Sequence, residues 1–245
     1  MKKFLSLCML TLAFLPPISC AGVRHFTFLY EAPTSTPGSV ELENTITWAR
    51  TPHWDDLGFR EELEIGLTEH FQLGIYPLDW AYHNGNTNCF SYDGGAVELI
   101  YNLSNPVVDP VGISLYTEIA GGRQRFELES KLIAQKNFGR LIFDYNATLE
   151  AEWEAKGLEE HNGELQQALG ASYEISPRIS VGVELLHEFV FSDWRDDEKI
   201  RNLFVGPNVS YRRGNWFVTV TALAQATDTD DESDFQVRTI FGIGL

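Results

Sequence analysis

Apolar and polar side chains alternate in segment after segment from residue 39 to residue 245, and this period of two limits the fold more than any other feature. In the longest run, residues 141–153, every odd-numbered residue is apolar and the even-numbered residues from 144 to 152 are polar. Such alternation indicates β-strands with one apolar and one polar face. About 12 segments of this kind follow one another, each of about ten residues, the length a tilted strand needs to cross a bilayer.

The connections and the hydropathy indicate how these strands close. No stretch after the first 22 residues is apolar for long enough to form a transmembrane helix, and a membrane protein without such helices can only be a closed barrel. Short connections (68–70, 136–139, 175–178, 212–215) alternate with longer polar loops (50–57, 81–94, 154–163, 188–201, 226–233). We therefore predict an all-β fold, an antiparallel up-and-down transmembrane β-barrel of about 12 strands over residues 39–245, with a bulge at Pro207 and a strand end near Pro77.

The first residues have the pattern of an export signal. Lys2 and Lys3 precede an apolar run over residues 4–14, so residues 1–21 are predicted to be a cleaved signal peptide. Lipidation of Cys20 is the alternative, and it leads to a third reading of the chain as a lipidated periplasmic barrel or sandwich. Residues 22–38 form a lead-in segment, in which residues 26–30 also alternate. The segment can be periplasmic, a strand of its own, or a piece tucked inside the barrel mouth.

The formal charge of −17 excludes nucleic acid as a partner, because a phosphate backbone requires a basic surface. It is compatible with an outer membrane, where acidic loops meet lipopolysaccharide through divalent cations. Cleavage after residue 21 leaves Cys89 as the one remaining cysteine, so no intramolecular disulfide is expected. We predict no cofactor and no metal site, and we interpret the acidic residues 228–234 as a solvated loop.

If the apolar face contacts lipid, the other face lines the lumen with charged side chains. The lumen-lining candidates are Arg60, Glu62, Glu64, Glu98, Glu118, Glu129, Lys131, Asp144, Glu150, Glu184 and Arg238. These charges can pair across the interior and close it, or they can leave a wet path that favours cations. Glycines recur on the same face, where we expect them to relieve crowding as the barrel curves.

Enzymatic activity is not predicted. A barrel lipase needs a His–Ser pair on the lipid-facing surface, and His187 has the outward parity but no serine at suitable spacing on that face. The histidines in loops also lack a nucleophile.

Two segments carry a resemblance to a known family. FTFLYEAPTSTPGSVELENTITW and EELEIGLTEHFQLGIY, within residues 26–76, resemble the small barrels related to the phenol-degradation meta-pathway outer-membrane proteins. The resemblance implies a Gram-negative outer-membrane barrel with a transport role and supplies no catalytic residues. The alternation that runs to Leu245 is similar to the terminal strand recognised by the barrel-assembly machinery, although that strand usually ends in Phe.

Two hypotheses about function follow. The first is a passive pore or transporter-like channel for small solutes whose identity the sequence does not give. The second is a barrel with a closed lumen that serves a structural or surface-interaction role through its acidic outer loops.

Overall fold

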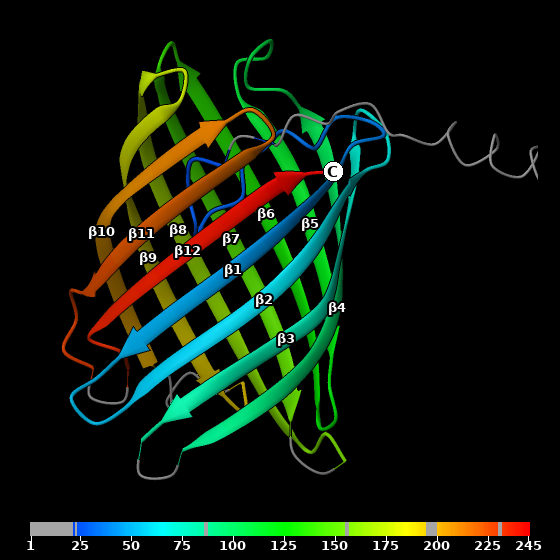
Figure 1. The fold of residues 1–245 in the computed structure, drawn as a ribbon. Coiled ribbons are helices and arrows are strands. Elements are labelled where there is room, and N and C mark those ends of the chain that lie inside the picture. The colour runs from blue at the N-terminus through cyan, green and yellow to red at the C-terminus, as the bar shows by residue number, and fades with distance from the viewer. Residues whose placement is uncertain (1–21, 23, 86–87, 155–156, 195–199, 230–231) are drawn as a thin grey trace, which may run out of the picture.

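The computed structural model describes residues 22, 24–85, 88–154, 157–194, 200–229 and 232–245, and over this range the chain is a closed antiparallel barrel (Figure 1). The predicted signal peptide and the lipidation of Cys20 lie outside the described residues. The strands are β1 (Val40–Arg50), β2 (Asp55–Gly66), β3 (Phe71–Asn84), β4 (Cys89–Ser104), β5 (Gly112–Gly121), β6 (Arg125–Phe138), β7 (Leu141–Glu154), β8 (Glu160–Ser176), β9 (Ile179–Ser192), β10 (Ile200–Arg213), β11 (Trp216–Gln225) and β12 (Phe235–Gly244).

Each strand pairs with its neighbour in sequence, and β12 closes the ring by pairing with β1. The prediction of an antiparallel barrel of 12 strands is therefore confirmed. In the part of the chain described, no helix is long and apolar enough to cross a membrane.

The barrel has two unlike ends. At the end we call the turn end, five connections lie beside the start of β1 and the end of β12; four of them have two to four residues, and the fifth, residues 105–111, has seven. The opposite end, the loop end, carries the remaining connections, which include the 51–54, 85–88 and 226–234 loops. In Figure 1 the turn end is at the top.

The alternation of the sequence becomes an outer and an inner wall. In β4, Val97 and Leu99 are 49% and 41% exposed, whereas Glu98 between them is 0% exposed. Because successive side chains of a strand point to opposite faces, one register places the apolar row outside and the carboxylates inside along the whole strand.

Both expectations about prolines are wrong. At Pro207 the register of β10 against β9 and β11 continues without a shift. Losing one hydrogen bond of the ladder costs less than a register shift that would turn every following side chain to the other face. At Pro77, β3 does not end but continues to Asn84. The register of β3 shifts there against both neighbours, so a bulge accommodates the proline.

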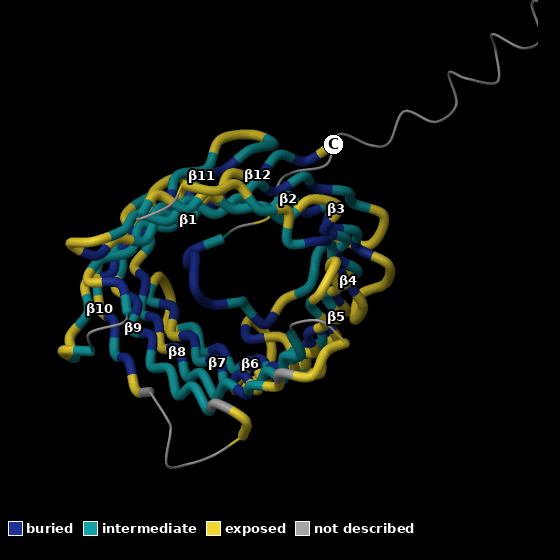
Figure 2. Tube along the Cα trace, turned by 90° about the horizontal axis from the view of Figure 1, so that it is seen from below, coloured by how far each residue is buried: buried dark blue, intermediate teal, exposed yellow. Residues whose placement is uncertain are grey.

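The lead-in segment lies inside the barrel, in the half next to the turn end (Figures 1 and 2). Viewed from the loop end, it runs across the space within the ring of strands (Figure 2). Of the placements that the sequence left open, the structure has the one inside the barrel.

Candidate functional site in the barrel lumen

The lead-in segment is held by side chains from many strands. Glu184 of β9 accepts hydrogen bonds from the backbone N–H groups of Thr27 (3.0 Å) and Phe28 (2.7 Å). Asn146 of β7 accepts from the N–H of Tyr30 at 2.7 Å and donates to its carbonyl oxygen at 2.9 Å. A segment without a strand partner thereby satisfies its buried backbone groups through the inner wall.

Further contacts continue this pattern along the segment. Barrel side chains that bond its backbone also include Gln72, Asn102, Ser114, Gln135, Asn208, Ser210, Thr219 and Arg238. Together these groups come from strands all around the ring.

Apolar side chains of the segment complete the interior. Phe26 and Leu29 are 0% and 1% exposed, and they belong to a cluster with Ile142, Ala168, Leu186, Phe204 and Leu223 of the inner wall. Gly170 makes room for this packing, because a Cβ atom there would lie 2.6 Å from Cε1 of Phe26. This inward glycine therefore serves close packing of the segment and not only curvature.

Two cavities lie on either side of the segment. The turn-end cavity has a volume of about 350 Å³, and the loop-end cavity has a volume of about 310 Å³. Arg24 and Tyr30 line both of them. The two cavities are therefore neighbours, with Arg24 and Tyr30 of the lead-in segment between them.

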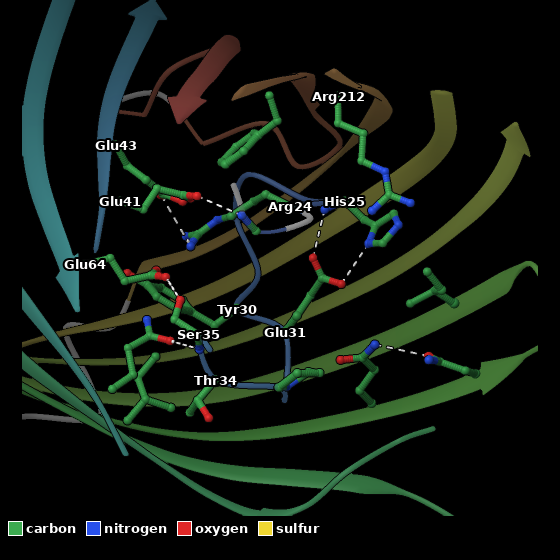
Figure 3. Close-up of a pocket in the computed structure, with 18 of the residues that line it drawn as sticks. Arg24, His25, Tyr30, Glu31, Thr34, Ser35, Glu41, Glu43, Glu64 and Arg212 are labelled. Atoms are coloured by element: carbon green, nitrogen blue, oxygen red, sulfur yellow. Dashed lines mark hydrogen bonds and ion pairs between the residues drawn. The ribbon is translucent and has the colours of Figure 1, made fainter. Parts of the chain in front are cut away.

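The turn-end cavity holds a network of ion pairs (Figure 3). Nδ1 of His25 lies 2.8 Å from a carboxylate oxygen of Glu31, and Nε2 of His25 lies 3.7 Å from Glu174. Glu174 is also 3.6 Å from Arg212, and Arg24 is 3.5 Å from Glu43. These pairs connect the segment to β1, β8 and β10.

His25 and Glu31 belong to the lead-in segment, outside the strands. Burial alone would lower the pKa of His25, but the carboxylates of Glu31 and Glu174 outweigh it and raise that pKa above its usual 6.5. Burial alone would raise the pKa of Glu31, but His25 lowers it below 4.5. Both shifts favour the charged pair.

The loop-end cavity combines ion pairs with aromatic rings. Arg60 pairs with Glu118 and lies 3.5 Å from Asp79, and its guanidinium carbon is 3.8 Å from the ring centroid of Tyr76. Lys131 is 3.0 Å from Glu129. Its ammonium nitrogen lies 4.5 Å from the ring centroids of both Tyr30 and Tyr116. The aromatic rings in the cavity wall therefore stabilise cations that lie over their faces.

The lumen-lining candidates predicted from the sequence lie on the inner wall, and their surroundings differ from one residue to another. Those that line the loop-end cavity are Arg60, Glu62, Glu118, Glu129, Lys131, Glu150 and Arg238. Glu64 lines the turn-end cavity. Glu98 accepts hydrogen bonds from Tyr30 and Tyr76, Glu184 holds the lead-in segment, and Asp144 accepts from Asn146.

Sequence reasoning missed the amides and the apolar residues of the inner wall. Asn146, Asn208 and Gln135 bind the lead-in segment, and Leu186 and Phe204 pack against it. One signal in the sequence could have indicated these apolar residues: Phe204 stands at a position where the alternation calls for a polar side chain. Within the described residues, no group of three or more His, Cys, Asp or Glu side chains is arranged to hold a metal ion.

Comparison with known proteins gives a family and a fold. A family model described as a family of unknown function, DUF6662, matches residues 18–239. The crystal structure of the COG4313 outer membrane channel from Pseudomonas putida F1 is similar in fold. Its TM-score is 0.70 at 8% sequence identity, covering 90% of this chain and 100% of that chain.

Two other solved structures have lower scores. The KdgM porin in complex with disordered oligogalacturonate gives a TM-score of 0.46 at 12% identity, covering 84% of this chain and 97% of that chain. The translocator domain of autotransporter NalP from Neisseria meningitidis gives 0.44 at 10% identity, covering 84% and 86%. No curated protein sequence matches the chain. The resemblance to the phenol-degradation barrels stays a prediction.

Proposed function

Because the chain belongs to DUF6662, a family of unknown function, we propose from its own lumen that it is an outer-membrane channel for small solutes. The observation that carries this proposal is the pair of lumen cavities that share Arg24 and Tyr30 as lining residues. The lead-in segment separates the two cavities at that level. No catalytic step is part of the proposal.

The outer surface supports a place in the outer membrane. Large apolar side chains such as Leu99, Leu149 and Val183 are 41%, 52% and 45% exposed on the outer wall, as an acyl-chain environment requires. The strands have 10 to 17 residues, enough to span the hydrocarbon when tilted. The solved structure of similar fold is also named an outer membrane channel.

In this arrangement the turn end faces the periplasm and the loop end faces outward, as in bacterial barrels with short periplasmic turns. Bilayer lipid and lipopolysaccharide are then the surroundings of the barrel. We propose the barrel-assembly machinery as the partner of β12.

Single-channel recording in planar bilayers tests the proposal. The full chain is expected to give small, reproducible conductance steps, because the lead-in segment narrows the lumen. The variant Glu184→Ala removes an acceptor of two backbone N–H groups of the segment and should increase the open time. Absence of any step in both proteins, at every salt concentration, would contradict a channel.

The second candidate function, a closed barrel with a structural or surface role, is favoured by the number of hydrogen bonds that hold the segment. On this alternative the lumen stays closed and the acidic outer loops are the functional surface. Binding of lipopolysaccharide that depends on divalent cations, together with silent bilayers, would favour this candidate over the channel.

A further inference from the structure

Glu62 of β2 is one of two carboxylates lining the loop-end cavity that have no hydrogen bond or ion pair within the described residues. It is 4% exposed, and its Oε1 atom is buried without a hydrogen bond. In the described part of the chain, no hydrogen bond or ion pair reaches this side chain at all. Burying a carboxylate without a hydrogen-bond partner is energetically costly, which makes the position of Glu62 informative.

The local backbone places Glu62 beside the loop-end cavity. In the β2–β3 ladder, Glu61 pairs with Leu78 and Leu63 with Ile75, so Glu62 lies opposite the bulge formed at Pro77. Bulges commonly redirect a side chain next to a functional site. Gly74 leaves the space that the carboxylate occupies, since a Cβ atom there would lie 2.6 Å from Oε1 of Glu62.

The rest of the cavity indicates what chemistry would satisfy this carboxylate. Glu150 also lines the cavity, and within the described residues it too has no hydrogen bond or ion pair. Of the cations that line the cavity, Arg60, Lys131 and Arg24 are paired with Glu118, Glu129 and Glu43, and Arg238 donates to Thr47. The described lining has four cations and six carboxylates, which leaves a formal charge of −2, and this net negative charge calls for a cation.

Aromatic rings in the wall favour an organic cation over a metal ion. Phe28, Tyr30, Tyr76 and Tyr116 line the cavity, and barrel cations already lie over their rings. Among the described residues, no three carboxylate or histidine side chains come together as a metal ion requires. One carboxylate beside aromatic faces is instead suited to an ammonium or a guanidinium group.

The lead-in segment itself shows this chemistry at the cavity boundary. The guanidinium carbon of Arg24 lies 4.6 Å from the ring centroid of Tyr30, and Nη1 lies 3.5 Å from Glu43. A guanidinium group is thus accommodated by an inner-wall carboxylate and a tyrosine ring.

We propose that the loop-end cavity binds a small organic cation with a guanidinium or ammonium group, for which Glu62 is the counter-ion. Protonation of Glu62 in the empty cavity is compatible with this role, because a bound cation favours the charged carboxylate. The proposal deepens the channel function by naming a solute class. Binding itself does not require conduction.

Saturation-transfer NMR on the full chain in detergent tests the site, with methylguanidinium as the probe and neutral N-methylurea as its isostere. The native barrel should bind methylguanidinium at least about tenfold more tightly than N-methylurea. The reason is that a charge-assisted hydrogen bond is about twice as strong as a neutral hydrogen bond. This comparison needs no substitution.

Glu62→Gln should weaken methylguanidinium binding about tenfold, the loss expected for one charge-assisted contact. Glu64→Gln is the matched control. Glu64 lies on the same strand and inner face, lines the turn-end cavity and accepts from Ser35, so its loss should change binding less than about twofold. Heat-modifiable migration in gels verifies that both variants fold.

No binding to the native barrel, equal binding of N-methylurea, or equal losses in the two variants would each overturn the proposal. Binding with silent bilayers would leave the cation site standing and remove the channel function. Conductance without binding would leave the channel function standing and remove the cation site.

Discussion

Replacing Glu184 by alanine tests how the lead-in segment is held. Glu184 is 1% exposed, and it accepts from the N–H groups of Thr27 and Phe28, from the side-chain amide of Asn208 at 2.8 Å and from the hydroxyl of Thr221. A hydrogen bond to a charged group contributes about 1.5–3 kcal/mol, so losing the two backbone bonds weakens docking by about 3–6 kcal/mol.

Hydrogen exchange followed by mass spectrometry measures this loss directly. A free-energy change of about 1.4 kcal/mol alters an equilibrium constant tenfold. Backbone amides of residues 24–32 should therefore exchange at least about a hundredfold faster in Glu184→Ala than in the native protein. Amides of β7 should keep their native protection, because the ring of strands stays closed.

Glu188→Ala is the matched control for this experiment. Glu188 lies on the same strand and face and accepts from Gln166 at 3.3 Å, and no hydrogen bond joins it to the described residues of the lead-in segment. Unchanged exchange in Glu184→Ala, or the same acceleration in Glu188→Ala, would refute the reasoning.

Three further predictions concern the segment and the topology. The pKa of His25 is raised, so its charge stabilises docking fully below about pH 6.5, and this contribution is lost as pH rises through the raised pKa. The pKa of Glu31 is lowered, so its contribution is lost only in acid. Protection of the segment, corrected for intrinsic exchange, should therefore fall as the pH rises above about 6.5, through the raised pKa of His25. Gly170→Val should force the ring of Phe26 to move and lower the docking stability by about 1–3 kcal/mol, seen as faster exchange of the segment. Cys89, an exposed free cysteine at the loop end, should react with an impermeant maleimide on intact cells.

Each of these has its own control. His25→Gln should make protection independent of pH over that range, and an unchanged slope would assign the effect to other groups. Gly121→Ala, at a glycine with open space around its Cβ position and no positive φ, should leave exchange of the segment native-like. For topology, Arg178→Cys in a Cys89→Ser background lies at the turn end and should stay unlabelled until the cells are permeabilised.

The strands could be predicted from the sequence because alternation is a local property. Residues 141–153 carry their parity in their own order, and the structure has β7 over Leu141–Glu154. The closed ring then followed from the lack of any other way to satisfy strand edges in hydrocarbon.

The sequence left the placement of the lead-in segment open and could not predict its contacts, because the contacting residues are separated by long stretches of sequence. Thr27 and Glu184 lie 157 positions apart, and Tyr30 and Asn146 lie 116 apart. Nothing near residues 26–30 indicates these partners. The lack of a partner at Glu62 is equally invisible in sequence, because it depends on which side chains the closed barrel brings within reach.

The central claim is that apolar side chains face acyl chains while their neighbours in the strand face a polar lumen. Spin labels at Leu149 and Glu150, adjacent in β7, test it in reconstituted liposomes: Leu149 is 52% exposed on the outer wall and Glu150 lines the loop-end cavity. The label at position 149 should collide mainly with lipid-dissolved oxygen and the label at 150 mainly with a water-soluble nickel reagent. Water contact at both positions, or lipid contact at both, would contradict the account.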